Sequence, residues 1–136
     1  MIHEGSIHLT FTYAAGPATS AFLAALQDRA EILGARCPGC DLVVTPARSF
    51  CPRCGERTGD LVPVGPEGVL VARTFDPVRG GFGLIRLDGA GTDMLHRLLG
   101  EPSSWRHSAR LRPRFAAERR GSITDIDGFE PTEATP

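Results

Sequence analysis

The chain contains no lysine, because all 15 basic residues among its 136 are arginines. Catalysis through a lysine Schiff base is therefore excluded. With 16 acidic residues the formal net charge is -1, which lacks the basic excess that nucleic acids and anionic membranes normally require. Exclusive use of arginine fits either a GC-rich genome or a surface where bidentate ion pairs meet a partner or a phosphate.

Long apolar runs are also missing. Arg or Gly interrupts every apolar stretch within about ten residues, whereas a membrane span needs roughly 20. The first residues, Met1–Gly5, lack the basic start and apolar region of a signal peptide. We therefore expect a cytoplasmic protein.

Sequence motifs for catalysis are absent as well. There is no Gly-x-Ser-x-Gly elbow, no phosphate-binding glycine loop and no His-Glu-x-x-His helix. The histidines are scattered, and His96 lies in a strand-like run where a structural role is expected. Asp125 and Asp127 have no evident partner, so we interpret them as solvated. No catalytic residue is predicted, and the chain does not look like a self-sufficient enzyme.

Four cysteines form two matched knuckles, Cys37-Pro38-Gly39-Cys40 and Cys51-Pro52-Arg53-Cys54. Two residues between cysteines bend the backbone so that both sulfurs face one point. The residue after each knuckle, Asp41 or Gly55, tolerates a positive φ. Four thiolates in this pattern make a closed tetrahedral site, which predicts one structural Zn²⁺ bound by Cys37, Cys40, Cys51 and Cys54.

Other interpretations of the cysteines stay open at this point. Two disulfides would need an oxidising compartment, and a redox dithiol would need only one pair. Rubredoxin-type iron uses similar knuckles. The ten residues between Cys40 and Cys51 are long enough for a β-hairpin that runs from Leu42–Val44 through a turn at 46–48 to Phe50.

The N-terminal part, residues 1–34, is expected to be an arm and a helix. Residues 6–13 alternate between apolar and polar side chains, as in a strand or extended arm. Residues 19–32 have apolar residues at helical spacing, with Thr19 or Ser20 as the cap and Gly34 closing the helix.

The remainder predicts a zinc ribbon over residues 35–64, a barrel over 65–128 and a disordered tail over 129–136. The turn cluster 65–68 marks the boundary. Five short strand-like runs with turns between them suggest a five-stranded OB-fold barrel: 69–75, 82–87, 93–99, 109–116 and 122–126. A short helical turn is expected at 101–105. The fold class is thus mainly β.

Arginines alternate in the fourth of these runs. Arg110, Arg112 and Arg114 fall on one face, while Leu111 and Phe115 face the barrel interior. The strip is either a solubilising outer face or a contact for an acidic partner or the phosphates of coenzyme A. The segment 79–83 is rich in glycine and is interpreted as a tight hairpin rather than a recognition loop.

Together these motifs resemble the acyl-CoA-associated zinc-ribbon/OB-fold proteins, a family of unknown function. The resemblance rests on four segments: Phe22-Leu23-x-x-Leu26, Arg36-Cys37-Pro38-x-Cys40, Pro46-x-Arg48-x-Phe50-Cys51-Pro52-x-Cys54, and Gly68-x-Leu70. Segments 83–89 and 123–129 are similar to the steroid-degradation branch of the family. Asp41, where the family has glycine, and the extension 1–18 depart from the pattern.

The resemblance implies an accessory role. Members of the family bind thiolase-fold enzymes. For this chain the resemblance implies a lipid-transfer-protein-like retro-aldolase of steroid side chains as the partner, and a MaoC-like enoyl-CoA hydratase as a further expected partner. The chain would bind and stabilise the enzyme and help to form its CoA channel. The alternatives are a single-stranded nucleic-acid-binding module and a stand-alone acyl-CoA-binding or electron-transfer protein.

Overall fold

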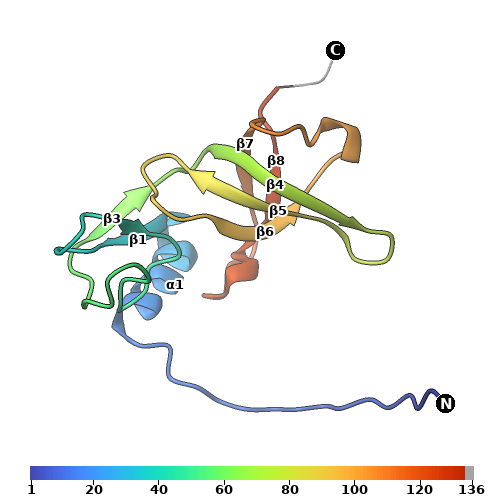
Figure 1. Cartoon of the computed structure of the whole chain (residues 1–136), viewed down its shortest axis with the longest axis horizontal. Helices are drawn as coiled ribbons and strands as arrows, with labels where there is room; N and C mark the ends of the chain where they lie inside the picture. Colours follow the sequence, from blue (N-terminus) through green and yellow to red (C-terminus); the bar gives the residue numbers. More distant parts are fainter. Residues whose placement is uncertain (134–136) are drawn as a thin grey trace.

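The computed structural model describes residues 1–133. Helix α1 (Pro17–Arg29) is followed by a three-stranded sheet of β1 (Ile32–Arg36), β2 (Val43–Val44) and β3 (Leu61–Val64). Five strands then form a closed barrel: β4 (Gly68–Asp76), β5 (Gly80–Leu87), β6 (Met94–Leu98), β7 (Arg110–Phe115) and β8 (Ile126–Pro131). The predicted mainly-β fold with one helix, a ribbon and a five-stranded barrel is confirmed (Figure 1).

The order of strands around the barrel is β4-β5-β6-β8-β7, and β4 closes it by pairing with β7. All neighbours are antiparallel except β6 and β8, which are parallel and share a single pair, Leu98 with Phe129. This is the arrangement of an OB barrel. The helical turn expected between the third and fourth strands is η1 (Pro102–Ser104).

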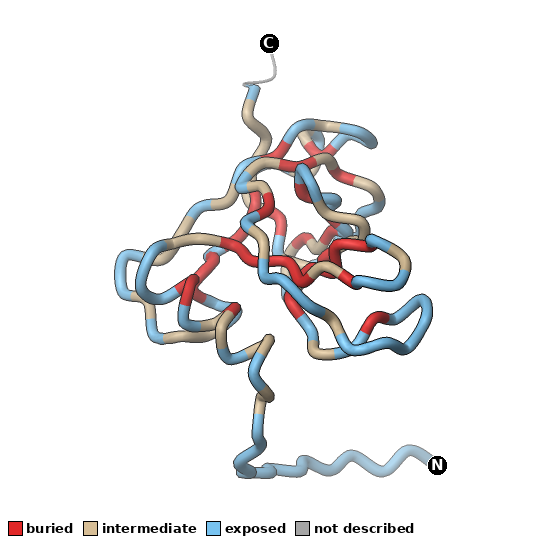
Figure 2. Tube along the Cα trace, turned by 90° about the vertical axis from the view of Figure 1, so that its left-hand side faces the viewer, coloured by how far each residue is buried: buried red, intermediate tan, exposed pale blue. Residues whose placement is uncertain are grey.

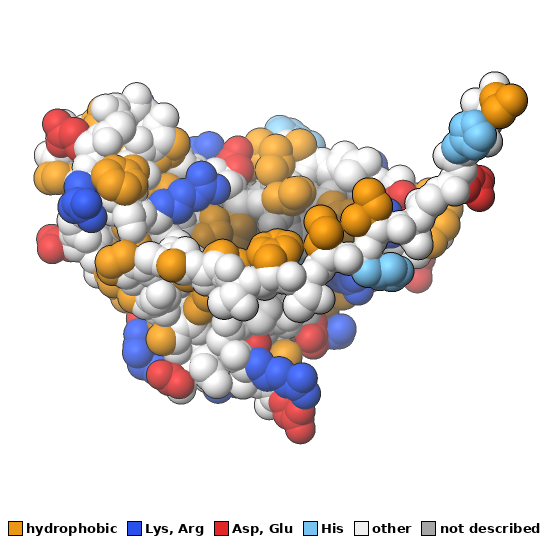
Figure 3. Space-filling view, turned by 90° about the horizontal axis from the view of Figure 1, so that it is seen from below, with side chains coloured by type: hydrophobic (Ala, Val, Ile, Leu, Met, Phe, Trp, Pro, Cys, Tyr) orange, Lys and Arg blue, Asp and Glu red, His pale blue; other side chains and the backbone are white. Residues whose placement is uncertain are grey.

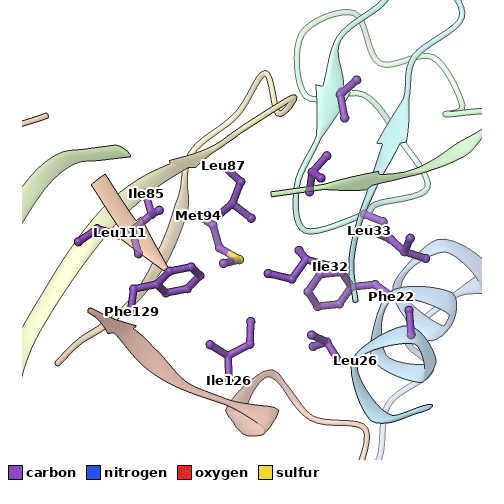
Figure 4. Close-up of a cluster of buried hydrophobic side chains, with 14 of the residues drawn as sticks. Phe22, Leu26, Ile32, Leu33, Ile85, Leu87, Met94, Leu111, Ile126 and Phe129 are labelled. Atoms are coloured by element: carbon purple, nitrogen blue, oxygen red, sulfur yellow. The ribbon is translucent and has the colours of Figure 1, made fainter. Parts of the chain in front are cut away.

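One hydrophobic core joins the helix, the ribbon sheet and the barrel (Figure 4). Phe22 and Leu26 of α1 meet Ile32 of β1, and the same cluster continues to Ile85 and Phe129 of the barrel. Buried segments accordingly run through both parts of the molecule (Figure 2). The ribbon is therefore anchored to the barrel by packing. No helix within residues 1–133 is long and apolar enough to cross a membrane.

The helix begins and ends earlier than its sequence pattern predicts. It begins at Pro17, whose fixed φ suits the first helical position, and Thr19 Oγ1 donates to Ala47 O instead of capping. It ends at Arg29, where Ala30 adopts a left-handed conformation with φ 50°. The prediction that Gly34 closes the helix is wrong, because Gly34 lies inside β1.

The final strand is shifted relative to the prediction. Residues 123–125 form a 3-10 turn, η2 (Ile123–Asp125), and β8 follows it to Pro131. The barrel thus extends beyond residue 128. Phe129 is completely buried, so the prediction of a disordered tail from 129 is wrong for residues 129–131. Residues 134–136 lie outside the described residues.

The glycine-rich segment 79–83 is part of the β4–β5 hairpin, as predicted. Asp76 Oδ1 accepts hydrogen bonds from the backbone N–H groups of Val78 at 2.7 Å and Arg79 at 2.8 Å, which fixes the turn. Gly81 lies directly against the buried indole of Trp105, in space that a Cβ would fill. Close packing therefore explains this glycine.

Candidate metal centre and neighbouring surfaces

Each cysteine knuckle is the tip of its own small hairpin. The first connects β1 to β2, where Cys37 N–H donates to Leu42 O and Asp41 N–H donates to Cys37 O. Asp41 has φ 58°, as expected for the residue after this knuckle. The predicted hairpin between the two knuckles is wrong, because the strand after the first knuckle pairs backward with β1.

The second knuckle repeats this geometry. Cys51 N–H donates to Glu56 O at 2.8 Å, and Gly55 N–H donates to Cys51 O at 2.9 Å. Gly55 has φ 79°, which confirms the conformation expected from its position. A single bridge between Phe50 and Arg57 closes the hairpin. Two equivalent turns therefore face one another with their sulfurs inward.

The four sulfurs form a tetrahedral set. Their Sγ atoms all lie within 4.8 Å of one another, and the pairs Cys37–Cys54 and Cys40–Cys51 are 3.4 Å and 3.5 Å apart. Four ligands about 2.3 Å from a central Zn²⁺ would be separated by about 3.8 Å, so the set fits one metal ion. The same separations are far longer than a disulfide bond of about 2.0 Å, and none of the four cysteines is joined in a disulfide.

The thiols need a cation to ionise together. The N–H of Cys54 lowers the pKa of Cys51 to about 6, with burial opposing the change and the N–H of Arg53 adding to it. The N–H of Glu56 acts to lower the pKa of Cys54, but the sulfur of Cys37 and burial outweigh it and raise this pKa to about 12. A divalent ion removes this conflict by stabilising every thiolate.

The three arginines of the β7 strip share the outer face of the barrel, and each has a carboxylate within the chain. Arg110 makes a bidentate contact with Asp88, at 2.8 and 2.7 Å, and also contacts Glu67. Asp88 and Glu67 raise its pKa. Arg112 and Arg114 pair with Glu130 at 3.3 Å and Asp127 at 3.7 Å. Their role as partner or CoA contacts stays a prediction.

His96 has the structural role expected for it. Its Nδ1 accepts from Arg97 N–H at 2.8 Å, so Nε2 carries the hydrogen and donates to Ile123 O at 3.2 Å. Burial lowers its pKa, which favours the neutral ring. The ring edge also contacts Phe129, with 5.6 Å between ring centroids.

His96 lines a groove of about 440 Å³ beside the β6–β8 junction. The lining residues are Phe82, Leu95, His96, Arg97, Ile123, Thr124, Ile126 and Asp127. Both nitrogens of the histidine are already engaged with backbone groups. The groove therefore offers shape and apolar surface rather than a free base.

Asp125 is a buried carboxylate that the sequence prediction placed in solvent. It is 3% exposed and accepts hydrogen bonds from the N–H groups of Arg120, Gly121 and Ser122. Burial acts to raise its pKa, but these donors and the charge of Arg119 lower it overall. The Ser122-x-x-Asp125 spacing of a capping box was the sequence signal that could have identified it.

Two solved structures share the fold of most of the chain. One, described as "Ltp2-ChsH2(DUF35) aldolase", is 18% identical with a TM-score of 0.64, and the match covers 90% of this chain and 100% of that chain. The other is a protein of unknown function from the DUF35 family of Sulfolobus solfataricus, at 23% identity and a TM-score of 0.60, covering 73% and 78%. A comparison with curated proteins finds no match.

The ribbon itself matches a family model. Residues 28–60 match the rubredoxin-like zinc ribbon domain of ChsH2, and this range includes all four cysteines of the tetrahedral set. The expected structural Zn²⁺ and the expected resemblance are both confirmed. The chain is thus similar to the ChsH2 zinc ribbon domain over residues 28–60, and it shares its fold with the two solved structures.

Proposed function

We propose that the chain is a non-catalytic accessory subunit that binds and stabilises a thiolase-fold acyl-CoA enzyme. The observation that carries the proposal is the match along nearly the whole chain to a structure described as an Ltp2-ChsH2(DUF35) aldolase. The ribbon model, which is that of ChsH2, supports the same assignment independently of the barrel. We propose further that the enzyme is a retro-aldolase of steroid side chains and that the complex acts in the cytoplasm.

The catalytic groups of such a complex belong to the enzyme. In this chain the four thiols form the metal site, and the nitrogens of His96 are engaged by backbone groups. Asp125 is held by three N–H donors. These groups stabilise the subunit, so retro-aldol proton transfer is assigned to the partner.

The arginine strip on β7 is the proposed contact with the enzyme or with CoA. Arg112 and Arg114 are each 56% exposed and have one carboxylate partner. A guanidinium has five N–H donors, so each can keep its partner and still donate to an acidic side chain or a phosphate. A MaoC-like hydratase stays a further predicted partner.

Co-expression with a thiolase-fold steroid aldolase tests the proposal. The expected result is a heteromeric complex that survives affinity and size-exclusion steps, with a defined mass by light scattering. Unmodified chain that elutes separately from the enzyme, under conditions where both are folded, would refute it. Arg112→Met should weaken the complex, whereas Arg79→Met at the far hairpin is the matched control.

A further inference from the structure

The N-terminal arm, residues 1–14, exposes a row of large apolar side chains. Ile7, Leu9, Phe11 and Tyr13 are 83%, 78%, 74% and 71% exposed. The rings of Phe11 and Tyr13 lie 6.2 Å apart, which shows that alternate residues share one face of an extended backbone. Four large apolar side chains exposed in a row on one face of the arm are unfavourable in water.

The backbone of the arm is also unpaired. Within residues 1–133, no intrachain hydrogen bond involves residues 1–15, and the first is donated to Gly16 O by Ser20. The arm stands away from the body in two perpendicular views (Figures 1 and 2). An extended segment with free N–H and C=O groups is ready to join the edge of a sheet.

A second copy of this chain is a poor acceptor for the arm. Among the described residues, β4 pairs with β7 only at Gly68 and Val69, and its outer part, residues 72–76, is exposed and carries the charged side chains of Arg73 and Asp76, which disfavour edge pairing. The ribbon sheet ends in β2, which has two residues, and in β3, which contains Pro63. A proline lacks the N–H that pairing needs, and very short strands give little support. These features favour a sheet edge on a different protein as the acceptor.

The arm leaves the body beside a second exposed apolar surface. Phe50 and Leu61 are 55% and 41% exposed, and the Arg57 guanidinium lies 5.0 Å from the centre of the Phe50 ring. A shallow groove of about 260 Å³ connects Leu61 and Arg57 to Pro17, the residue where α1 begins. Figure 3 shows apolar side chains spaced along the arm and further apolar side chains on the body.

We propose that residues 6–13 bind the partner enzyme as an added β-strand, with Ile7, Leu9, Phe11 and Tyr13 packed on its apolar surface. The inference rests on the proposed function, which supplies the partner. Eight extended residues span about 26 Å. The two aromatic side chains alone bury about 300–500 Å², a large part of the roughly 800 Å² per partner found in a stable complex.

The His8–Thr12 face of the same strand would remain in solvent. His8, Thr10 and Thr12 are all exposed and polar. Strand addition at a sheet edge requires this difference between faces, because only one face meets the partner's apolar surface while the other meets water. Random hydrophobic attachment would not require the alternation.

The test uses the reconstituted complex and two matched triple variants. Ile7→Thr/Leu9→Thr/Phe11→Thr keeps strand propensity and removes the apolar face, whereas His8→Gln/Thr10→Ser/Thr12→Ser changes the polar face. Because the arm makes no contact that stabilises the body, both should keep the zinc content and melting temperature of the unmodified chain. The first should weaken binding to the enzyme at least about 100-fold, and the second should leave it within about threefold.

Single prolines and hydrogen exchange test the strand geometry. Alternate N–H groups of an edge strand face the partner, so prolines at successive positions from 7 to 12 should weaken binding at every second position only. Amide exchange in residues 6–13 should slow when the enzyme binds.

Each alternative result overturns the inference in a recognisable way. Unchanged affinity without residues 1–14, or arm exchange that stays fast in the complex, would refute strand addition while leaving the accessory role intact. Failure of the unmodified chain to form any complex with the enzyme would refute both strand addition and the accessory role. A dimer of the chain alone that is lost on removing the arm would show that a second copy is the acceptor.

Discussion

Replacing Cys54 by Ser should remove the zinc and unfold the knuckles while the barrel stays folded. Cys54 is the exposed ligand of the set, so the change creates no cavity in the core. The 18 residues from Cys37 to Cys54 lose about 18 kcal/mol of conformational freedom on folding, at about 1 kcal/mol each.

Packing within this segment recovers only part of that cost. Its buried apolar side chains contribute about 9 kcal/mol, at about 1.5 kcal/mol each. They are Cys37, Leu42, Val43, Val44, Ala47 and Cys51. The remaining deficit of about 9 kcal/mol is close to the 10–16 kcal/mol that structural zinc supplies to ribbon-like peptides at neutral pH. Without the metal the knuckles should therefore be disordered.

Zinc analysis and hydrogen exchange together measure this outcome. The unmodified chain should bind one zinc and Cys54→Ser none, and the Asp41 and Gly55 amides should lose protection while amides of β5 keep theirs. Arg53→Ser alters the same knuckle without removing a sulfur and should retain the metal. Simultaneous loss of protection in the knuckles and the barrel would refute the reasoning, as would full zinc content in Cys54→Ser.

Three further substitutions probe the barrel. Gly81→Ala should destabilise the chain by about 1–3 kcal/mol in denaturant unfolding, because its Cβ would displace the buried Trp105; an unchanged midpoint would contradict this packing. Asp125→Asn should lower the free energy of unfolding by about 2–3 kcal/mol at pH 7, because it weakens the hydrogen bonds from three N–H donors. The folded-state pKa of Asp125 lies below its ordinary 3.8, so the carboxylate stabilises the fold above pH 3.8 and loses this effect as the pH falls through the folded-state value. The stabilities of the variant and the unmodified chain should therefore become equal in acid. A stability difference that does not change with pH would contradict this role of the carboxylate. Arg110 lowers the pKa of Asp88, so Arg110→Met should raise that pKa toward its ordinary value in an NMR titration. If the pKa of Asp88 stays low in the variant, another group causes the shift.

The knuckles were predictable because their geometry is local. Two residues between cysteines and a residue that accepts positive φ determine each turn, and both Asp41 and Gly55 behave as expected. The first four strands of the barrel were predictable for a similar reason, since period-2 alternation and turn residues mark them directly. The last strand, β8, begins where the predicted run 122–126 ends.

Features that depend on distant contacts were harder to predict. Ile32 and Leu33 fit a helical face as well as a strand, and only pairing of β1 with β3 decides between them. The pairing of β2 with β1, rather than with the chain at Phe50 just before the second knuckle, is likewise a tertiary choice. The carboxylate partners of Arg110 lie 22 and 43 residues away in the chain, so charge compensation of the strip could not be seen in the sequence.

Turnover of a steroid acyl-CoA aldol substrate by the thiolase-fold enzyme, with and without this chain, tests the central claim most directly. We predict that the chain alone gives no cleavage and that adding the zinc-loaded chain restores a stable, active enzyme. An enzyme that is equally stable and active without the chain would contradict the account.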